Sequence, residues 1–70
     1  SAQTFVPVFG ELVRFIYGCI AEKNELRLLV AQFAACVVED VSDLAGWEEL
    51  LTEVPAFAAD LVYDLANRYA

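Results

Sequence analysis

The chain has 70 residues, 60% of them apolar, and carries a formal net charge of −7 without a single histidine. This length corresponds to one domain, 1–70, near the lower limit for folding without disulfides or metals. The lack of histidine excludes most zinc and haem sites and any nucleophile activated by histidine. Because so small a domain does not easily bury this much apolar surface, the composition predicts an interaction module.

The cysteines and the N-terminus predict a cellular location. Cys19 and Cys36 lie in separate apolar runs, where unpaired thiols are typically buried and reduced, so we expect core thiols in an intracellular protein, cytoplasmic or nuclear. The N-terminus lacks the basic region of a signal peptide. The most apolar run, 12–21, contains Arg14 and falls short of the roughly 20 residues of a membrane span. Ser1 is interpreted as a cloning remnant on an excised domain.

A first helix is predicted over 7–17. Its apolar residues recur at steps of three and four, and Pro7 suits the first helical position, where its missing N–H costs no hydrogen bond. Only Glu11 and Arg14 mark a polar side. We therefore expect this helix to be central, or to face a partner as well as the core.

A second helix is predicted from Asn24, as the N-cap, to about Val41. One side of it is polar. Ala31 and Ala35 are small enough to let another helix approach closely. The apolar stripe comprises Leu26, Leu29, Val30, Phe33, Ala34, Val37, Val38 and Val41.

A third, shorter helix is predicted over 44–53, capped by Ser42 or Asp43, and Pro55 opens a fourth helix with almost no loop between them. We find no strand pattern in the sequence. The fold class is therefore all-α, a compact bundle of about four helices in which the first two form a central antiparallel hairpin. The predicted core consists of Phe9, Leu12, Val13, Ile16, Leu29, Phe33, Val37, Trp47, Leu50, Leu51, Phe57, Leu61 and Leu65.

Charge excludes several kinds of chemistry. Every charged residue between Glu39 and Asp64 is acidic, and such a field repels nucleic-acid phosphates. Neighbouring carboxylates on a helix diverge instead of converging on one atom, so Glu48 and Glu49 do not form an acid–base pair. No EF-hand loop is present. The sequence predicts neither an enzyme nor a metal, cofactor or small-molecule substrate site.

Aromatic side chains are the candidate anchors of an interface, since they dominate interface energetics. Tyr63 is a candidate because it lies on a different side of the predicted fourth helix from Phe57, Leu61 and Leu65. The acids of the third helix would form the rim. The candidate interface residues are Phe15, Tyr17, Tyr63, Tyr69, Glu48 and Glu49.

Two stretches resemble one family. Residues 9–18, FGELVRFIYG, are similar to the BTB/POZ helix that ends in Phe-Ile-Tyr-Thr-Gly, although the threonine is missing here. Residues 25–36, 47–51 and 55–61 resemble the C-terminal helices of divergent, fungal-type BTB proteins, whose N-terminal strands have no counterpart in the chain. The resemblance covers about 7–66. It implies protein–protein association through helices, by homo-oligomerisation or as an adaptor or scaffold.

We therefore expect a non-enzymatic interaction module that binds a protein partner or a second copy of itself, as a homodimer. No direct nucleic-acid, membrane or small-molecule partner is expected. One alternative is an acidic docking domain for a basic peptide or protein tail. A more remote one is a small-ligand or acyl carrier bundle, for which Ser42 stands in the wrong sequence context.

Overall fold

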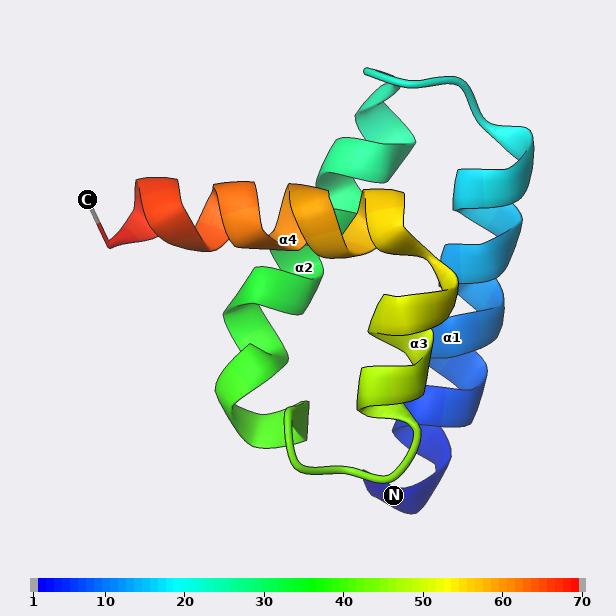
Figure 1. Cartoon of the computed structure of the whole chain (residues 1–70), viewed down its shortest axis with the longest axis vertical. Helices are drawn as coiled ribbons and strands as arrows, with labels where there is room; N and C mark the ends of the chain where they lie inside the picture. Colours follow the sequence, from blue (N-terminus) through cyan, green and yellow to red (C-terminus); the bar gives the residue numbers. More distant parts are fainter. Residues whose placement is uncertain (1, 70) are drawn as a thin grey trace.

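The computed structural model describes residues 2–69, which form four α-helices joined by short connections (Figure 1). No strand occurs among these residues, which confirms the predicted all-α class. Ser1, interpreted above as a cloning remnant, lies outside the described residues. The helices are α1 (Ala2–Cys19), α2 (Glu25–Val41), α3 (Trp47–Glu53) and α4 (Pro55–Arg68).

The first helix is longer than predicted at both ends. Pro7 lies inside α1 and not at its first position, although a proline there removes one helical hydrogen bond. Phe5 and Val6, which precede it, pack with the core, and their burial favours a helix that begins before the proline. At the other end the helix continues past Gly18 to Cys19.

The second helix has the predicted bounds. Asn24 is its N-cap, with a side-chain oxygen that accepts a hydrogen bond from the Leu26 N–H at 2.9 Å. The helix ends at Val41. A local capping interaction therefore determines where α2 begins.

The third helix begins at Trp47, later than predicted, and neither Ser42 nor Asp43 caps it. Its N-cap is Gly46, whose φ of 90° lies in the left-handed region that glycine adopts without strain. Turns occupy the connection from α2. Pro55 opens α4 as predicted, and Val54 serves both as the C-cap of α3 and as the N-cap of α4.

The helices form two layers. Helices α1 and α2 run antiparallel as a hairpin, as predicted, while α3 and α4 lie on one face of it (Figure 1). Figure 1 also shows that α4 crosses α2 instead of running along it. Ala31, Ala34 and Ala35 are buried in α2, and their short side chains permit the close crossing.

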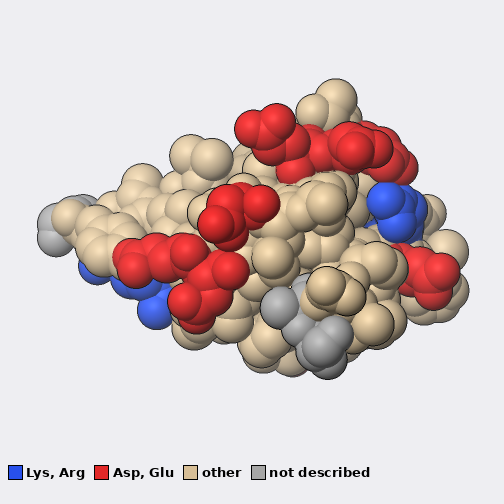
Figure 2. Space-filling model, turned by 90° about the horizontal axis from the view of Figure 1, so that it is seen from below, with Lys and Arg blue, Asp and Glu red and all other residues tan. Residues whose placement is uncertain are grey.

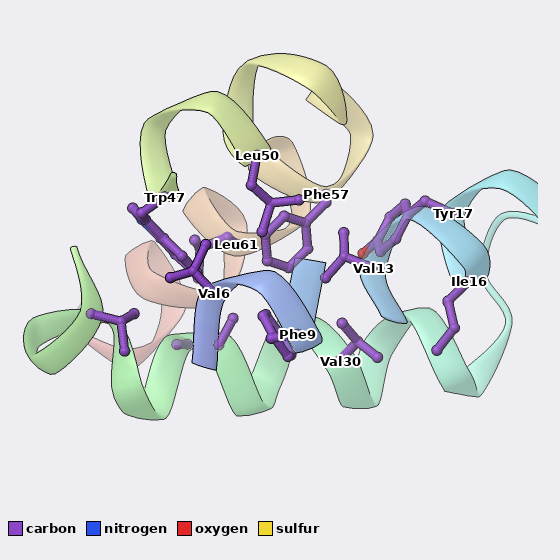
Figure 3. Packing of buried hydrophobic residues seen from close by; sticks show 13 residues of the cluster. Val6, Phe9, Val13, Ile16, Tyr17, Val30, Trp47, Leu50, Phe57 and Leu61 are labelled. Carbon is purple, nitrogen blue, oxygen red and sulfur yellow. The ribbon is translucent and has the colours of Figure 1, made fainter. Parts of the chain in front are cut away.

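The core lies between these layers, with Phe57 of α4 at its centre (Figure 3). Its ring centroid lies 6.0 Å from that of Phe9, 5.7 Å from Tyr17 and 6.2 Å from Trp47. Phe57, Leu50 and Val13 are the largest fully buried side chains. One aromatic side chain therefore connects α1, α3 and α4.

Most of the predicted core is confirmed. Val37, Leu51 and Leu65 are partly buried against it. Leu12, Leu29 and Phe33 are exposed, so their assignment to the core was wrong. The core thiols were also a wrong prediction, since Cys19 and Cys36 are free and exposed. The confirmed residues are Phe9, Val13, Ile16, Trp47, Leu50, Phe57 and Leu61.

The position of Phe57 predicts a large loss of stability on truncation. Phe57→Ala should lower the free energy of unfolding by about 3–5 kcal/mol, because it removes buried contacts and leaves a cavity. The measurement is urea denaturation followed by far-UV circular dichroism. Val62→Ala, at an exposed position of the same helix, is the control and should change the free energy by less than about 0.5 kcal/mol. Equal urea midpoints for Phe57→Ala and the unaltered chain would contradict this packing.

Substitution by alanine is predicted to have opposite effects on stability at Gly46, the α3 N-cap, and at Gly18 in α1. Gly46→Ala should cost about 1–2 kcal/mol, because alanine is strained at positive φ and its Cβ would lie 3.2 Å from a Val6 methyl group. Gly18→Ala should stabilise by up to about 1 kcal/mol, since alanine favours the helix and its Cβ would meet no atom within 4 Å. Urea midpoints measure both. Shifts of the same sign would refute the backbone geometry at Gly46.

Candidate interaction surface

Large apolar side chains are exposed along one side of each helix of the hairpin. On α1, Val8, Leu12 and Phe15 are 67%, 46% and 62% exposed. On α2, Leu26, Leu29 and Phe33 are 46%, 59% and 48% exposed. Leu29 and Phe33 line a hollow with Asp64, Asn67 and Arg68 of α4, so α4 borders the α2 residues on one side. Each helix of the hairpin is therefore apolar on two adjacent sides, of which only one faces the core.

These residues follow a regular spacing. Steps that alternate between three and four residues place side chains along one narrow line of a helix. We call the two lines seams, and together they form what we call the apolar face. The α1 seam is Phe5, Val8, Leu12, Phe15 and Cys19, and the α2 seam is Leu26, Leu29, Phe33 and Cys36.

Three phenylalanine rings join the two seams. The Phe33 ring centroid on α2 lies 6.3 Å from that of Phe5 and 5.7 Å from that of Phe9, both on α1. Phe5 and Phe9 stack on each other at 5.1 Å. Phe5 and Phe9 also line an apolar hollow with Val8 and Leu12. The seams are thus parts of one surface and not two isolated patches.

A polar cluster fixes the other end of the hairpin. The Tyr17 hydroxyl donates a hydrogen bond of 2.7 Å to the Asp60 carboxylate of α4. The Arg27 guanidinium of α2 donates to the Tyr17 carbonyl at 2.9 Å and lies 4.6 Å from the centroid of the Tyr17 ring. Tyr17, predicted as an interface anchor, is buried. It holds three helices together instead.

The structure separates the other predicted interface residues. Of them, only Phe15 lies on the apolar face. Tyr63 is 70% exposed on the side of α4 opposite Leu61, and the hydroxyl of Tyr69 donates to the Glu39 carboxylate at 3.4 Å. Glu48 and Glu49 lie exposed in the first turn of α3.

Sequence reasoning missed five of the six large exposed side chains of the apolar face. The apolar periodicity of the sequence marks two adjacent sides of each helix and does not tell which of them meets α3 and α4. The alternating three-and-four spacing was the signal that could have identified the exposed residues. The missed residues are Val8, Leu12, Leu26, Leu29 and Phe33.

Five carboxylates lie at the end of the molecule where α2 ends and α3 begins, the end that Figure 2 views: Glu39, Asp40, Asp43, Glu48 and Glu49. Asp64 and Arg68 of α4 line a hollow beside the α2 seam. Arg14 and Glu53 form an exposed, two-pronged ion pair, with N···O distances of 3.0 and 3.2 Å. This pair raises the pKa of Arg14 and lowers that of Glu53, and exposed pairs of this kind contribute little to stability. No seam position carries a charge.

Other kinds of site were searched for among residues 2–69. No three His, Cys, Asp or Glu side chains there gather closely enough to hold a metal ion. No helix in that range combines the length and apolar character that a membrane crossing requires. Comparison with protein-family models, curated proteins and solved structures gave no match. The apolar face is the feature that remains to be explained.

The Tyr17–Asp60 contact predicts a pH-dependent effect. The pKa of Tyr17 is raised above its ordinary value of 10.0. Burial of the phenol is the larger cause, and its hydrogen bond to Asp60 is the next. The folded state therefore holds the phenolic proton more tightly, so the stabilisation is complete below about pH 10 and is lost as pH rises through the raised pKa. Tyr17→Phe should cost about 1.5–3 kcal/mol near neutral pH.

The stability difference between Tyr17→Phe and the unaltered chain should narrow as pH rises from about 8 to about 11. Urea midpoints across this range measure it. Tyr63→Phe, the same change at an exposed tyrosine, is the matched control. A difference that stays constant with pH would argue against the Tyr17–Asp60 contact.

Proposed function

We propose that this chain is a non-enzymatic protein-interaction module whose contact surface is the apolar face. The supporting observation is that six large apolar side chains remain in water along two joined seams. Together they expose on the order of 600 Å², at the upper end of the ~300–600 Å² that the largest apolar patch of a typical monomer covers. A patch of this size is typical of a binding surface.

The exposed area sets the scale of the hydrophobic gain available for association. Removing ~600 Å² from water contributes on the order of 15 kcal/mol at about 25 cal/mol per Å². Association costs an estimated 4–15 kcal/mol in lost freedom of movement. The apolar face can thus offset that cost without strong polar contacts.

Two sequence features agree with this proposal. The resemblance to BTB/POZ helices implies association through helices, either between copies or as an adaptor or scaffold. Cys19 and Cys36 are free and exposed, and exposed thiols remain reduced in the cytoplasm and nucleus. We therefore place the module in one of these two compartments.

The acidic docking domain is the second candidate, and Figure 2 favours it through its concentration of carboxylates. Asp43, Glu48 and Glu49 line a shallow hollow between α2 and α3. A basic peptide tail would bind there through charge, so binding would weaken in ~1 M salt, where screening acts over about 3 Å. Association through the apolar face would survive that salt.

The proposed function predicts which substitution abolishes partner capture. Immobilised chain should retain its partner in ~1 M salt, and Leu29→Asp should lose it, because a charge placed in the apolar contact must be desolvated. Val62→Asp is the matched control: Val62 is comparably exposed but lies on α4, away from the seams. It should capture as the unaltered chain does. Quantitative mass spectrometry of the retained proteins is the measurement.

Both variants should keep the urea midpoint within about 0.5 kcal/mol of the unaltered chain, since the sites are exposed. Equal capture by Leu29→Asp and the unaltered chain would overturn the apolar face as the contact surface. The acidic docking domain would be supported instead by a different result. In that case ~1 M salt and Glu48→Gln would each abolish capture, while Leu29→Asp would leave it unchanged.

A further inference from the structure

We infer that the partner of the apolar face is a second copy of this chain, which lays its own α1 and α2 on the first to form a symmetric four-helix bundle from two hairpins. This inference rests on the proposed function and names the occupant of its surface. Three observations carry it: the spacing of the seams, the area that they expose and the placement of the charges.

The spacing specifies a helix pair as the partner. From Phe5 to Cys19 the α1 seam steps by four-residue and three-residue intervals in alternation, and the α2 seam does the same from Leu26 to Cys36. This is the pattern of positions that interlock between the helices of bundles and coiled coils. Two seams side by side match a partner that also presents two. The hairpin of an identical chain has that surface, and a two-fold axis would make the contact self-complementary.

The exposed area agrees with a dimer. A standard stable interface buries about 800 Å² on each partner. The six large side chains supply on the order of 600 Å² of this. The exposed Cys19 and Cys36 extend the seams, and the Phe5 ring lies at the start of the α1 seam. A single short helix lying between the seams would leave much of that surface in water.

The charges permit two copies to meet. Each copy carries a net charge of −7, which would oppose association if the acids faced one another. No seam position is charged, and five of the eleven carboxylates lie at the end where α2 meets α3. Asp64 and Arg68 of α4, which carry opposite charges, border the α2 seam. Asp40 stands at the next step of the α2 seam after Cys36 and ends the apolar run. Salt should therefore strengthen the dimer, because it screens the remaining repulsion.

The first test is the solution mass. Sedimentation equilibrium from ~1 to ~200 µM should give twice 7.7 kDa at the upper concentrations. Phe15→Asp should remain monomeric throughout. Tyr63→Asp is the matched control, because Tyr63 is 70% exposed against 62% for Phe15 and the change in charge is the same. It should dimerise as the unaltered chain does, and both variants should keep the unaltered circular dichroism spectrum.

The second test locates the contact through a native thiol. Cys36 lies on the α2 seam beside Leu29 and Phe33. Its alkylation by iodoacetamide should slow at least about tenfold between concentrations well below and well above the dissociation constant. In Phe15→Asp the rate should not change with concentration. A dimer in which Cys36 reacts at the monomer rate would use another face and would overturn the inference.

The outcomes separate this inference from the proposed function. A strict monomer at ~100 µM, well above the Kd of a typical stable interface, overturns the second copy as the partner. The unaltered chain, though monomeric, could still capture a different protein, and the Leu29→Asp variant could fail to do so. The proposed function would then hold, with that protein as the partner of the apolar face. If Leu29→Asp changes neither mass nor capture, both proposals fail.

Discussion

Burial of the Phe57 ring is the constraint on which the packing of the other helices depends. The ring lies among Phe9, Tyr17 and Trp47, which belong to α1 and α3. An aromatic side chain of this size must be enclosed on all sides to leave water, and here the enclosure requires α3 and α4 to lie on the same face of the hairpin. Short alanines on α2 permit that arrangement. The seam side chains of α1 and α2 take no part in this enclosure and stay exposed.

That asymmetry connects the fold to the proposed function. Among residues 2–69, the large side chains of the seams stay exposed although they are apolar. The aromatic core packs the helices together, while the seams retain six of the ten large apolar side chains that stay exposed. Under the proposed function, stability and association would depend on different sides of the same two helices. Substitutions on the seams can alter binding without unfolding the chain.

Electrostatics follows the same division. Five carboxylates lie where α2 ends and α3 begins, at the end that Figure 2 views. The part-buried Tyr17–Asp60 hydrogen bond joins α1 to α4. Acidic side chains that remain in water keep a very apolar chain from non-specific association. Because no seam position is charged, a contact through the seams removes no charged seam side chain from water, and its desolvation cost is low.

The sequence by itself determined the helical class, the bounds of α2 and the opening of α4, because the Asn24 cap, Pro55 and the helical periodicity are local features. It could not place the start of α1 or of α3, since burial of Phe5 and Val6 outweighs the Pro7 penalty and the left-handed Gly46 replaces a side-chain cap. Only the tertiary structure decided which apolar side of α1 and α2 is core. Periodicity marks a residue as apolar and places it on a helix face, whereas its burial depends on which neighbour covers that face.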